Sequence, residues 1–239
     1  MANRFCEQLE KTVRGSSRPM GFSQTVAAVK PRLFIMAETP DLEDGASLPG
    51  IDAVLAANPC KCKGMKSGVL LGCAVHGTSK NDGCDFLVFN LDGAVSADCG
   101  EETARLLRIE PDLTDAQLRA VGGLDMAAVI AEAGLGVSLT FRDLLTVQRL
   151  IDFCGRQPVL LKIAQLYSKA ELQSLWDRGI TGIVFDTGAI GAAELRQLID
   201  GLEPKKRSKE KSTAIVSQPP AAAHVESETE PDIEPDEDE

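Results

Sequence analysis

The sequence predicts an α/β protein folded as a short (βα)8 barrel, and three observations lead to this prediction. Eight short apolar runs of the kind that form strands recur along the chain. Amphipathic helix patterns separate the later runs, which is typical of parallel strands joined by crossovers. Some runs, such as residues 182–185, are apolar without interruption, as in strands that are covered on both faces. Eight such units close most simply into a barrel, and an open doubly wound sheet is the alternative.

The predicted strands are rich in Val, Ile, Leu and Phe. They lie at residues 33–37, 53–56, 69–75, 86–89, 105–109, 127–131, 159–164 and 183–186. Helices are predicted after the last four runs, where Thr114 and Ser168 are suitable N-cap residues for two of them. These helices lie at residues 115–121, 140–153, 169–177 and 192–202.

The first half of the predicted barrel has poorly formed helices. Only residues 59–66 and 77–83 connect the second, third and fourth runs, and neither segment can form a covering helix. An amphipathic N-terminal helix is predicted at residues 3–13. Apolar side chains on the outer face of this flank need a cover, either that helix or a second copy of the chain in a dimer. The side chains considered for this face are Val54, Leu70 and Leu71.

Three segments follow from composition: an N-terminal helix and connector (1–30), the barrel (31–203), and a disordered linker with an acidic tail (204–239). Nine acidic residues and no basic residue lie between Glu226 and Glu239, directly after a short basic linker. The remaining part of the chain is only mildly acidic. A broad nucleic-acid-binding face is therefore not expected, because phosphate contacts require clustered Lys and Arg.

The cellular setting is predicted from segments that are missing and from the cysteines. Neither a signal-peptide pattern nor an apolar run of membrane-spanning length is found, so we expect a cytoplasmic protein without membrane contact. Seven cysteines are an odd number, and Cys73, Cys84 and Cys154 lie in or beside apolar segments. We interpret them as free thiols of a reducing compartment. Cys60 and Cys62 form a C-x-C motif without further ligands at metal-binding spacing.

Candidate functional residues are those at the carboxyl ends of the strands, where (βα)8 barrels carry their sites. Polar residues end nearly every predicted strand, and a closed barrel would bring them to one mouth. The simpler interpretation is that strand ends are polar because they meet solvent. The residues concerned are Glu38, Asn58, His76, Asn90, Asp92, Glu110, Glu132, Lys162, Gln165 and Asp186.

Lys162 is the most informative of these residues because it interrupts an apolar strand. Apolar neighbours disfavour the ammonium form, which would suit a Schiff-base nucleophile or a general base. The structural alternative is an ion pair with Glu110 or Glu132 across the mouth. Glu110 and Glu132 end neighbouring strands, so they are candidates for a general acid and base or for half of a metal site.

The remaining candidates concern substrate binding. His76 is the only histidine of the predicted barrel, which excludes a multi-histidine zinc site, and no metal or cofactor is implied. Asp186 and Gly188 begin a glycine-containing loop, 187–191, that leads into the last helix. Such a loop can cradle a phosphate where its glycine leads into the free N–H groups of the last helix, and its glycines can equally be ordinary turn residues.

The segment from Asp177 to Gly188, DRGITGIVFDTG, resembles the ending of aldolase-type, phosphate-binding TIM barrels. Residues 32–202 also resemble a family of uncharacterised bacterial TIM-barrel proteins with a basic linker and a charged tail. The resemblance implies a barrel with its site at the mouth. The phosphate-binding barrels also have glycine after the seventh strand, where this chain has Ala164, Gln165 and Leu166.

Two functions remain open at the level of sequence. The first is a non-catalytic binding or scaffold module that engages a protein partner through its exposed flank and tail. The second is a lyase or isomerase acting on a small anionic, phosphorylated metabolite. In that enzyme Lys162, Glu110 and Glu132 would be catalytic, and His76, Asp186 and Gly188 would bind the substrate.

Overall fold

The computed structural model describes residues 3–15, 33–40, 49–56, 68–75, 83–93, 103–155 and 157–204. All of them belong to one compact unit, Met1–Lys206. Several residues about which the sequence makes predictions lie outside the described ranges: Asn58, Cys60, Cys62, His76 and the segment 205–239.

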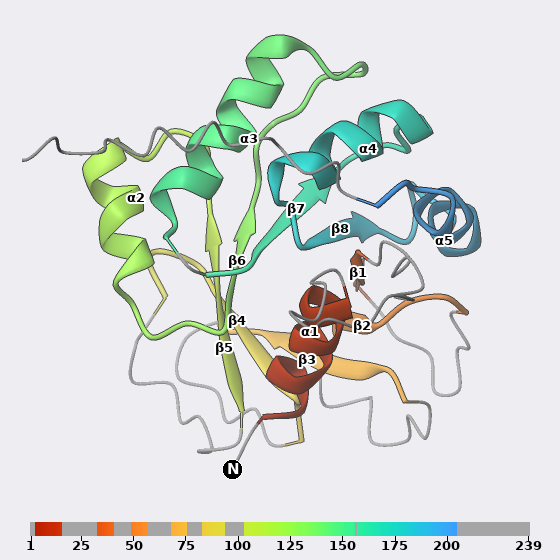
Figure 1. The fold of residues 1–239 in the computed structure, drawn as a ribbon. Helices are drawn as coiled ribbons and strands as arrows, with labels where there is room; N and C mark the ends of the chain where they lie inside the picture. The colour runs from red at the N-terminus through yellow and green to blue at the C-terminus, as the bar shows by residue number, and fades with distance from the viewer. Residues whose placement is uncertain are drawn as a thin grey trace, which may run out of the picture. The chain divides into compact units, whose positions relative to one another are not determined.

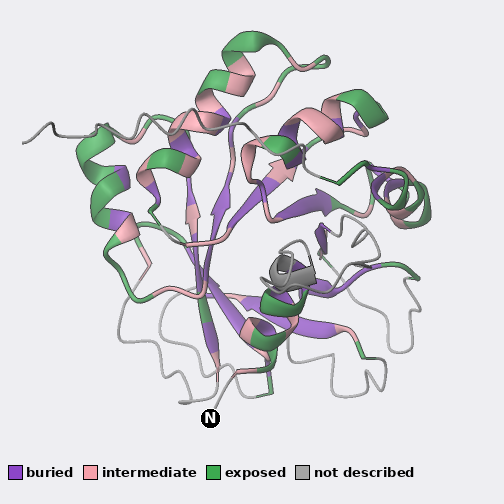
Figure 2. Ribbon diagram, in the orientation of Figure 1, coloured by how far each residue is buried: buried purple, intermediate pink, exposed green. Residues whose placement is uncertain are grey.

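Eight parallel strands form a closed barrel in which each strand pairs with its neighbours in the sequence and β8 pairs with β1 (Figure 1). The predicted barrel is therefore confirmed, and the open sheet is excluded. Figure 2 shows that the strands are buried along most of their length. The strands are β1 (Phe34–Thr39), β2 (Ala53–Ala56), β3 (Leu70–Ala74), β4 (Phe86–Phe89), β5 (Ala104–Ile109), β6 (Ala128–Ala131), β7 (Val159–Ile163) and β8 (Gly182–Asp186).

Four helices follow the last four strands, and consecutive helices contact one another around the outside of the barrel (Figure 1). Within the described ranges, no helix lies between β1 and β5. The predicted short connections lie outside these ranges, except for Gly83. Thr114, Thr140 and Ser168 each form a capping box at a helix start, which satisfies N–H groups that the helix leaves unpaired. The helices are α2 (Asp115–Gly122), α3 (Phe141–Phe153), α4 (Lys169–Arg178) and α5 (Ala192–Asp200). No helix in these ranges is long and apolar enough to span a membrane.

The amphipathic helix α1 (Arg4–Gly15) closes one end of the barrel. Its Phe5 and Leu9 are buried in the cluster of inward-facing side chains from the strands. The Phe5 ring lies 5.4 Å from the ring of Phe34 and 4.9 Å from that of Phe86, measured between centroids. Both partners begin their strands, so α1 lies at the amino ends, which we call the closed end. Figure 1 shows α1 apart from the row of α2 to α5.

The prediction that the N-terminal helix covers the outer flank is therefore wrong. Alternation along β3 places Leu70 inside the barrel and Leu71 outside, with Val54 of β2 also outside and buried. At the closed end, the rings of Phe34 and Phe86 bury Phe5 of α1 more completely than an outer face of the barrel would. Whether a second copy covers the flank stays a prediction.

Two inward-facing glycines make room for the aromatic side chains at the closed end. A Cβ on Gly72 would lie 2.0 Å from the Phe86 ring, and a Cβ on Gly182 would lie 2.6 Å from the carbonyl oxygen of Phe34. Small residues opposite large ones fill the narrow interior of a barrel of this size. The glycines thus fix where the rings of Phe34 and Phe86 lie.

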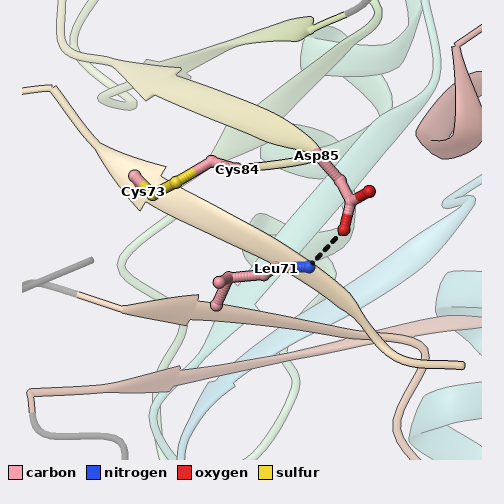
Figure 3. The surroundings of a disulfide bond; sticks show 4 residues. All are labelled: Leu71, Cys73, Cys84 and Asp85. Carbon is pink, nitrogen blue, oxygen red and sulfur yellow. Dashed lines mark hydrogen bonds between the residues drawn. A yellow bond between two sulfur atoms is a disulfide. The ribbon is translucent and has the colours of Figure 1, made fainter. Parts of the chain in front are cut away.

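Cys73 and Cys84 form a disulfide in the structure, which corrects the expectation that both are free thiols (Figure 3). Cys73 lies on β3 and Cys84 just before β4, and the register of these neighbouring strands brings their Cα atoms to 6.3 Å. Such a separation lies within the range of disulfides. Cys154 is free and buried, as predicted, and burial raises the pKa of its thiol to about 11.

Two aspartates at the closed end tie strands and helices together. Asp85 accepts a hydrogen bond from the Leu71 N–H at 2.9 Å (Figure 3), and Arg4 of α1 pairs with it at 2.8 Å. Asp52 accepts a hydrogen bond from the Ile35 N–H at 2.9 Å and pairs with Arg196 of α5 at 2.8 Å. Each carboxylate therefore joins a strand backbone to a helix.

Candidate functional site

A cavity of about 320 Å³ opens at the carboxyl ends of the strands, which we call the open end. Leu55, Ala74 and Val88 give it an apolar part. The remaining lining comes from polar groups and one proline: Glu38, Thr39, Pro40, Asn90, Arg108 and Asp186. A small apolar cavity with a few convergent polar groups is the usual form of a small-molecule site.

Four charged side chains from four strands form a closed cluster beside this cavity. The Lys162 Nζ lies 2.9 Å from Glu38 Oε2 and 3.0 Å from Glu132 Oε1. Arg108 donates from Nη2 to Glu38 Oε1, and its Nη1 lies 3.3 Å from Glu132 Oε1. Strand alternation produces the cluster, since each of these side chains points inward at the open end of its strand. We call these four residues the open-end cluster.

The direction of the Lys162 pKa favours the ion pair over a lysine that loses its proton easily. Burial alone lowers this pKa, but the hydrogen bonds and charges of Glu38 and Glu132 outweigh burial and the Arg108 charge, so the pKa is raised. The side chain keeps 30% of its exposure. Lys162 is therefore a stable ammonium group at neutral pH, which suits an ion pair and does not suit an amine nucleophile.

The other predicted catalytic residues separate in the structure. Glu132 joins the cluster, and Lys162 pairs with it as the structural alternative proposed. Glu110 is exposed and is not among the residues that line the cavity. In the part of the chain that the structure describes, Glu110 forms no ion pair with Lys162 or Arg108. The structure thus does not bring Glu110 and Glu132 together as an acid and base pair.

The loop after β8 uses its own N–H groups. Gly188 donates to the Asp186 carboxylate at 2.8 Å, and Thr187 donates to the Glu38 carbonyl at 3.1 Å. Ala189 and Ile190 both donate to the Asp186 carbonyl, at 3.0 and 3.1 Å. These four N–H groups are therefore engaged within the turn, whereas the start of α5, to which the loop leads, has no side-chain cap, so the phosphate cradle stays a prediction. Asp186 itself lines the cavity.

Arg108 is the member of the open-end cluster that sequence reasoning missed. It interrupts Leu106-Leu107-Arg108-Ile109 in the way that Lys162 interrupts Leu160-Leu161-Lys162-Ile163. The signal was present, because both cations occupy an inward position near the end of an apolar strand. Glu38 was recognised only as a strand end, and its contact with both cations depends on barrel closure.

A second group of contacts fixes the loop that follows Glu132. Tyr167 is buried and donates its hydroxyl to the carbonyl of Gly136 at 2.7 Å, and Gln165 donates to the same oxygen at 2.9 Å. Burial raises the pKa of Tyr167, so it stays a donor at neutral pH. Glu171 accepts from the Leu139 N–H at 2.8 Å. These contacts hold the loop and so help to position Glu132.

The described ranges contain no group of three or more His, Cys, Asp and Glu side chains that could hold a metal ion. His76, a predicted substrate-binding residue, lies outside them.

No protein-family model matches the sequence, and no curated protein matches it. Tryptophan synthase from M. tuberculosis, in an aminoacrylate- and BRD0059-bound form, is similar in structure with a TM-score of 0.51 and 12% identity. The match covers 84% of this chain and 96% of that chain. A likeness at this identity shows the fold alone, a TIM barrel, as the resemblance implied.

Two further solved structures match more weakly. Thiamine phosphate pyrophosphorylase from Pyrococcus furiosus has a TM-score of 0.47 and 12% identity, covering 70% of this chain and 96% of that chain. HpcH/HpaI aldolase from Desulfitobacterium hafniense has a TM-score of 0.45 and 10% identity, covering 80% and 93%.

Proposed function

We propose that this barrel is a non-catalytic binding module whose open-end cavity binds a small anionic metabolite. The observation that carries the proposal is the position of Arg108, which lines the cavity and, among the described residues, is paired with the carboxylates of the open-end cluster. The apolar part of the cavity can bury the rest of a small ligand.

Arg108 retains donor capacity for such a ligand. Its Nε is buried and, among the described residues, has no hydrogen-bond partner, although both terminal nitrogens contact carboxylates. A guanidinium group offers a planar fork of donors that matches a carboxylate or phosphate. A ligand anion would replace Glu38 or Glu132 on part of this fork, and the displaced carboxylate keeps Lys162 as its partner.

The occupied lysine supports binding rather than catalysis. Lys162 is held as an ammonium group between two carboxylates, and Glu110 is exposed outside the cavity lining. Neither a free amine nucleophile nor a free acid and base pair is therefore available among the predicted catalytic residues.

The proposal is tested by titrating the full chain with ethyl phosphate and with 4-methylpentanoate, followed by calorimetry. Arg108→Gln should weaken binding about ten-fold, the usual effect of losing a hydrogen bond to a charged group. The matched control is Arg105→Gln, because Arg105 lies on the same strand but is exposed on the outer face. Its affinity should equal that of the wild type.

Thermal unfolding of both variants shows whether each is folded, and Lys162→Met replaces Arg108→Gln if the latter does not fold. Equal affinities of the Arg108 and Arg105 variants, or no binding of either probe to the wild type, would contradict the proposal.

A lyase or isomerase is the second candidate, and one contact favours it. Lys162 and Glu132 are 3.0 Å apart, a distance at which a proton can pass between an acid and a base. With its raised pKa, Lys162 would act as the acid. The reaction would then require Lys162: Lys162→Met should abolish turnover of any substrate found while leaving its binding measurable. Turnover that survives this change would remove Lys162 from the mechanism.

A further inference from the structure

Asp186 differs from the two carboxylates of the open-end cluster. It ends β8 and lines the cavity, and its Oδ1 accepts a hydrogen bond from the Gly188 N–H at 2.8 Å. Glu38 and Glu132 each contact two cations. Within the described ranges Asp186 forms no ion pair, so its negative charge is balanced only by a backbone dipole.

The charges of the open end decide which ligand fits. Among the described residues that line the cavity or belong to the open-end cluster, Arg108 and Lys162 balance Glu38 and Glu132, and Asp186 leaves one negative charge in excess. A phosphate dianion would add further negative charge next to Asp186, and the two negative charges would repel although the Asp186 side chain is exposed. A ligand that also carries a positive group leaves the net charge of the open end unchanged.

The loop after β8 also favours a ligand with a singly charged anionic group. Its N–H groups at Thr187, Gly188, Ala189 and Ile190 already have acceptors, so these four groups do not offset a second negative charge on a ligand bound at Arg108. A singly charged carboxylate on Arg108 therefore suits the site better than a phosphate dianion.

We propose that the ligand is a zwitterion of the amino-acid class, whose cationic nitrogen pairs with the Asp186 carboxylate. The placement of its anionic group on Arg108 rests on the proposed function, whereas the cationic group rests on Asp186 alone. The side chain of the ligand lies against Leu55, Ala74 and Val88.

Three matched probes separate the two parts, with the full chain titrated by calorimetry or ligand-observed NMR. Leucine carries both charges, 4-methylpentanoate lacks the ammonium group, and 3-methylbutylamine lacks the carboxylate. O-phosphoethanolamine and ethyl phosphate form a second pair that tests a phosphate in place of the carboxylate. We expect leucine to bind about five-fold more tightly than 4-methylpentanoate, as for a solvent-accessible ion pair. We also expect leucine to bind more tightly than O-phosphoethanolamine.

Asp186→Asn removes the charge and keeps an oxygen for the Gly188 N–H. This variant should bind leucine and 4-methylpentanoate with equal affinity. The control is Asp92→Asn, because Asp92 is exposed in the loop after β4 and is not part of the cavity lining. It should keep the wild-type preference.

The outcomes are distinct. Equal binding of leucine and 4-methylpentanoate to the wild type overturns the zwitterion and leaves the anion site of the proposed function intact. Equal binding of leucine and 3-methylbutylamine supports the Asp186 contact and overturns the anion site. A leucine preference that persists in Asp186→Asn assigns the ammonium group elsewhere and overturns the inference, as does O-phosphoethanolamine binding more tightly than leucine. If none of the five probes binds at millimolar concentration, both the zwitterion and the anion site of the proposed function are contradicted.

Discussion

The two ends of the barrel use charged side chains in different ways. At the closed end, Asp52 and Asp85 each accept a strand N–H and each pair with an arginine of a helix. At the open end, the ion pairs of Glu38 and Glu132 within the described part of the chain are all with the cations of the open-end cluster.

This difference separates structural charges from charges kept for another purpose. A carboxylate that holds a backbone N–H and a helix contributes to the fold directly. Four partly buried charges that pair only with one another gain little over apolar packing, because desolvation offsets their attraction. Their presence beside a cavity is therefore better explained by a ligand than by stability.

The largest effect is expected from removing the aromatic group that closes the barrel. Phe5→Ala should lower the free energy of unfolding by about 3–5 kcal/mol, because a fully buried ring between Phe34 and Phe86 is lost. Urea unfolding followed by circular dichroism measures the change. Lys11→Ala is the control, since Lys11 is exposed on the same helix and its loss should cost less than about 0.5 kcal/mol. A similar small loss for Phe5→Ala would show that α1 does not close the barrel.

The next effect compares the two aspartates of the closed end. Asp52→Asn should cost about 2 kcal/mol, because Asp52 is 3% exposed and its charge binds Arg196 out of contact with water. Asp85→Asn should cost less than about 1 kcal/mol, because its partner Arg4 is 67% exposed. The same urea titration measures both. Equal losses of unfolding free energy in the two variants would mean that burial does not make the Asp52–Arg196 pair stronger than the Asp85–Arg4 pair.

Much of the fold could be predicted because its signals are local. Apolar runs marked all eight strands, and the hydroxyl residues Thr114 and Ser168 marked the starts of α2 and α4 through their own capping bonds. The position of α1 was not predictable in this way. Its amphipathic pattern shows that Phe5 is buried but not against which surface, and only the alternation of β1 and β4 places two rings at the same barrel end.

The open-end cluster could be predicted only in part. Lys162 stood out as a charge within an apolar strand, and Glu132 was considered as its partner. Glu38 comes from a strand far away in sequence, so its contact with Lys162 depends on closure of the barrel. The direction in which the Lys162 pKa shifts followed from that contact, since burial alone lowers this pKa. The Cys73–Cys84 pair likewise depends on the register between β3 and β4.

The smallest effect is a difference in pH dependence between the two ends. Glu38 and Glu132 hold the pKa of Lys162 above its ordinary value, after outweighing burial. Stability from a raised pKa is fully present below the unfolded-state pKa, about 10.4 for lysine, and is lost as pH rises through the folded-state pKa. The free energy of unfolding of the wild type minus that of Lys162→Met should therefore fall between about pH 9 and pH 11.5.

At the closed end the corresponding difference should stay constant over this range, because the guanidinium of Arg196 keeps its charge there. Urea unfolding of the wild type, Lys162→Met and Asp52→Asn across the same buffers measures both differences, so titration of cysteines and tyrosines common to the three proteins cancels. A Lys162 difference as flat as that of Asp52 would mean that the cluster does not raise the pKa of Lys162, and the comparison of the ends would fail. A Lys162 difference that instead increases with pH would mean a lowered pKa, so that Lys162 would be available as a nucleophile and the open end would support the enzyme.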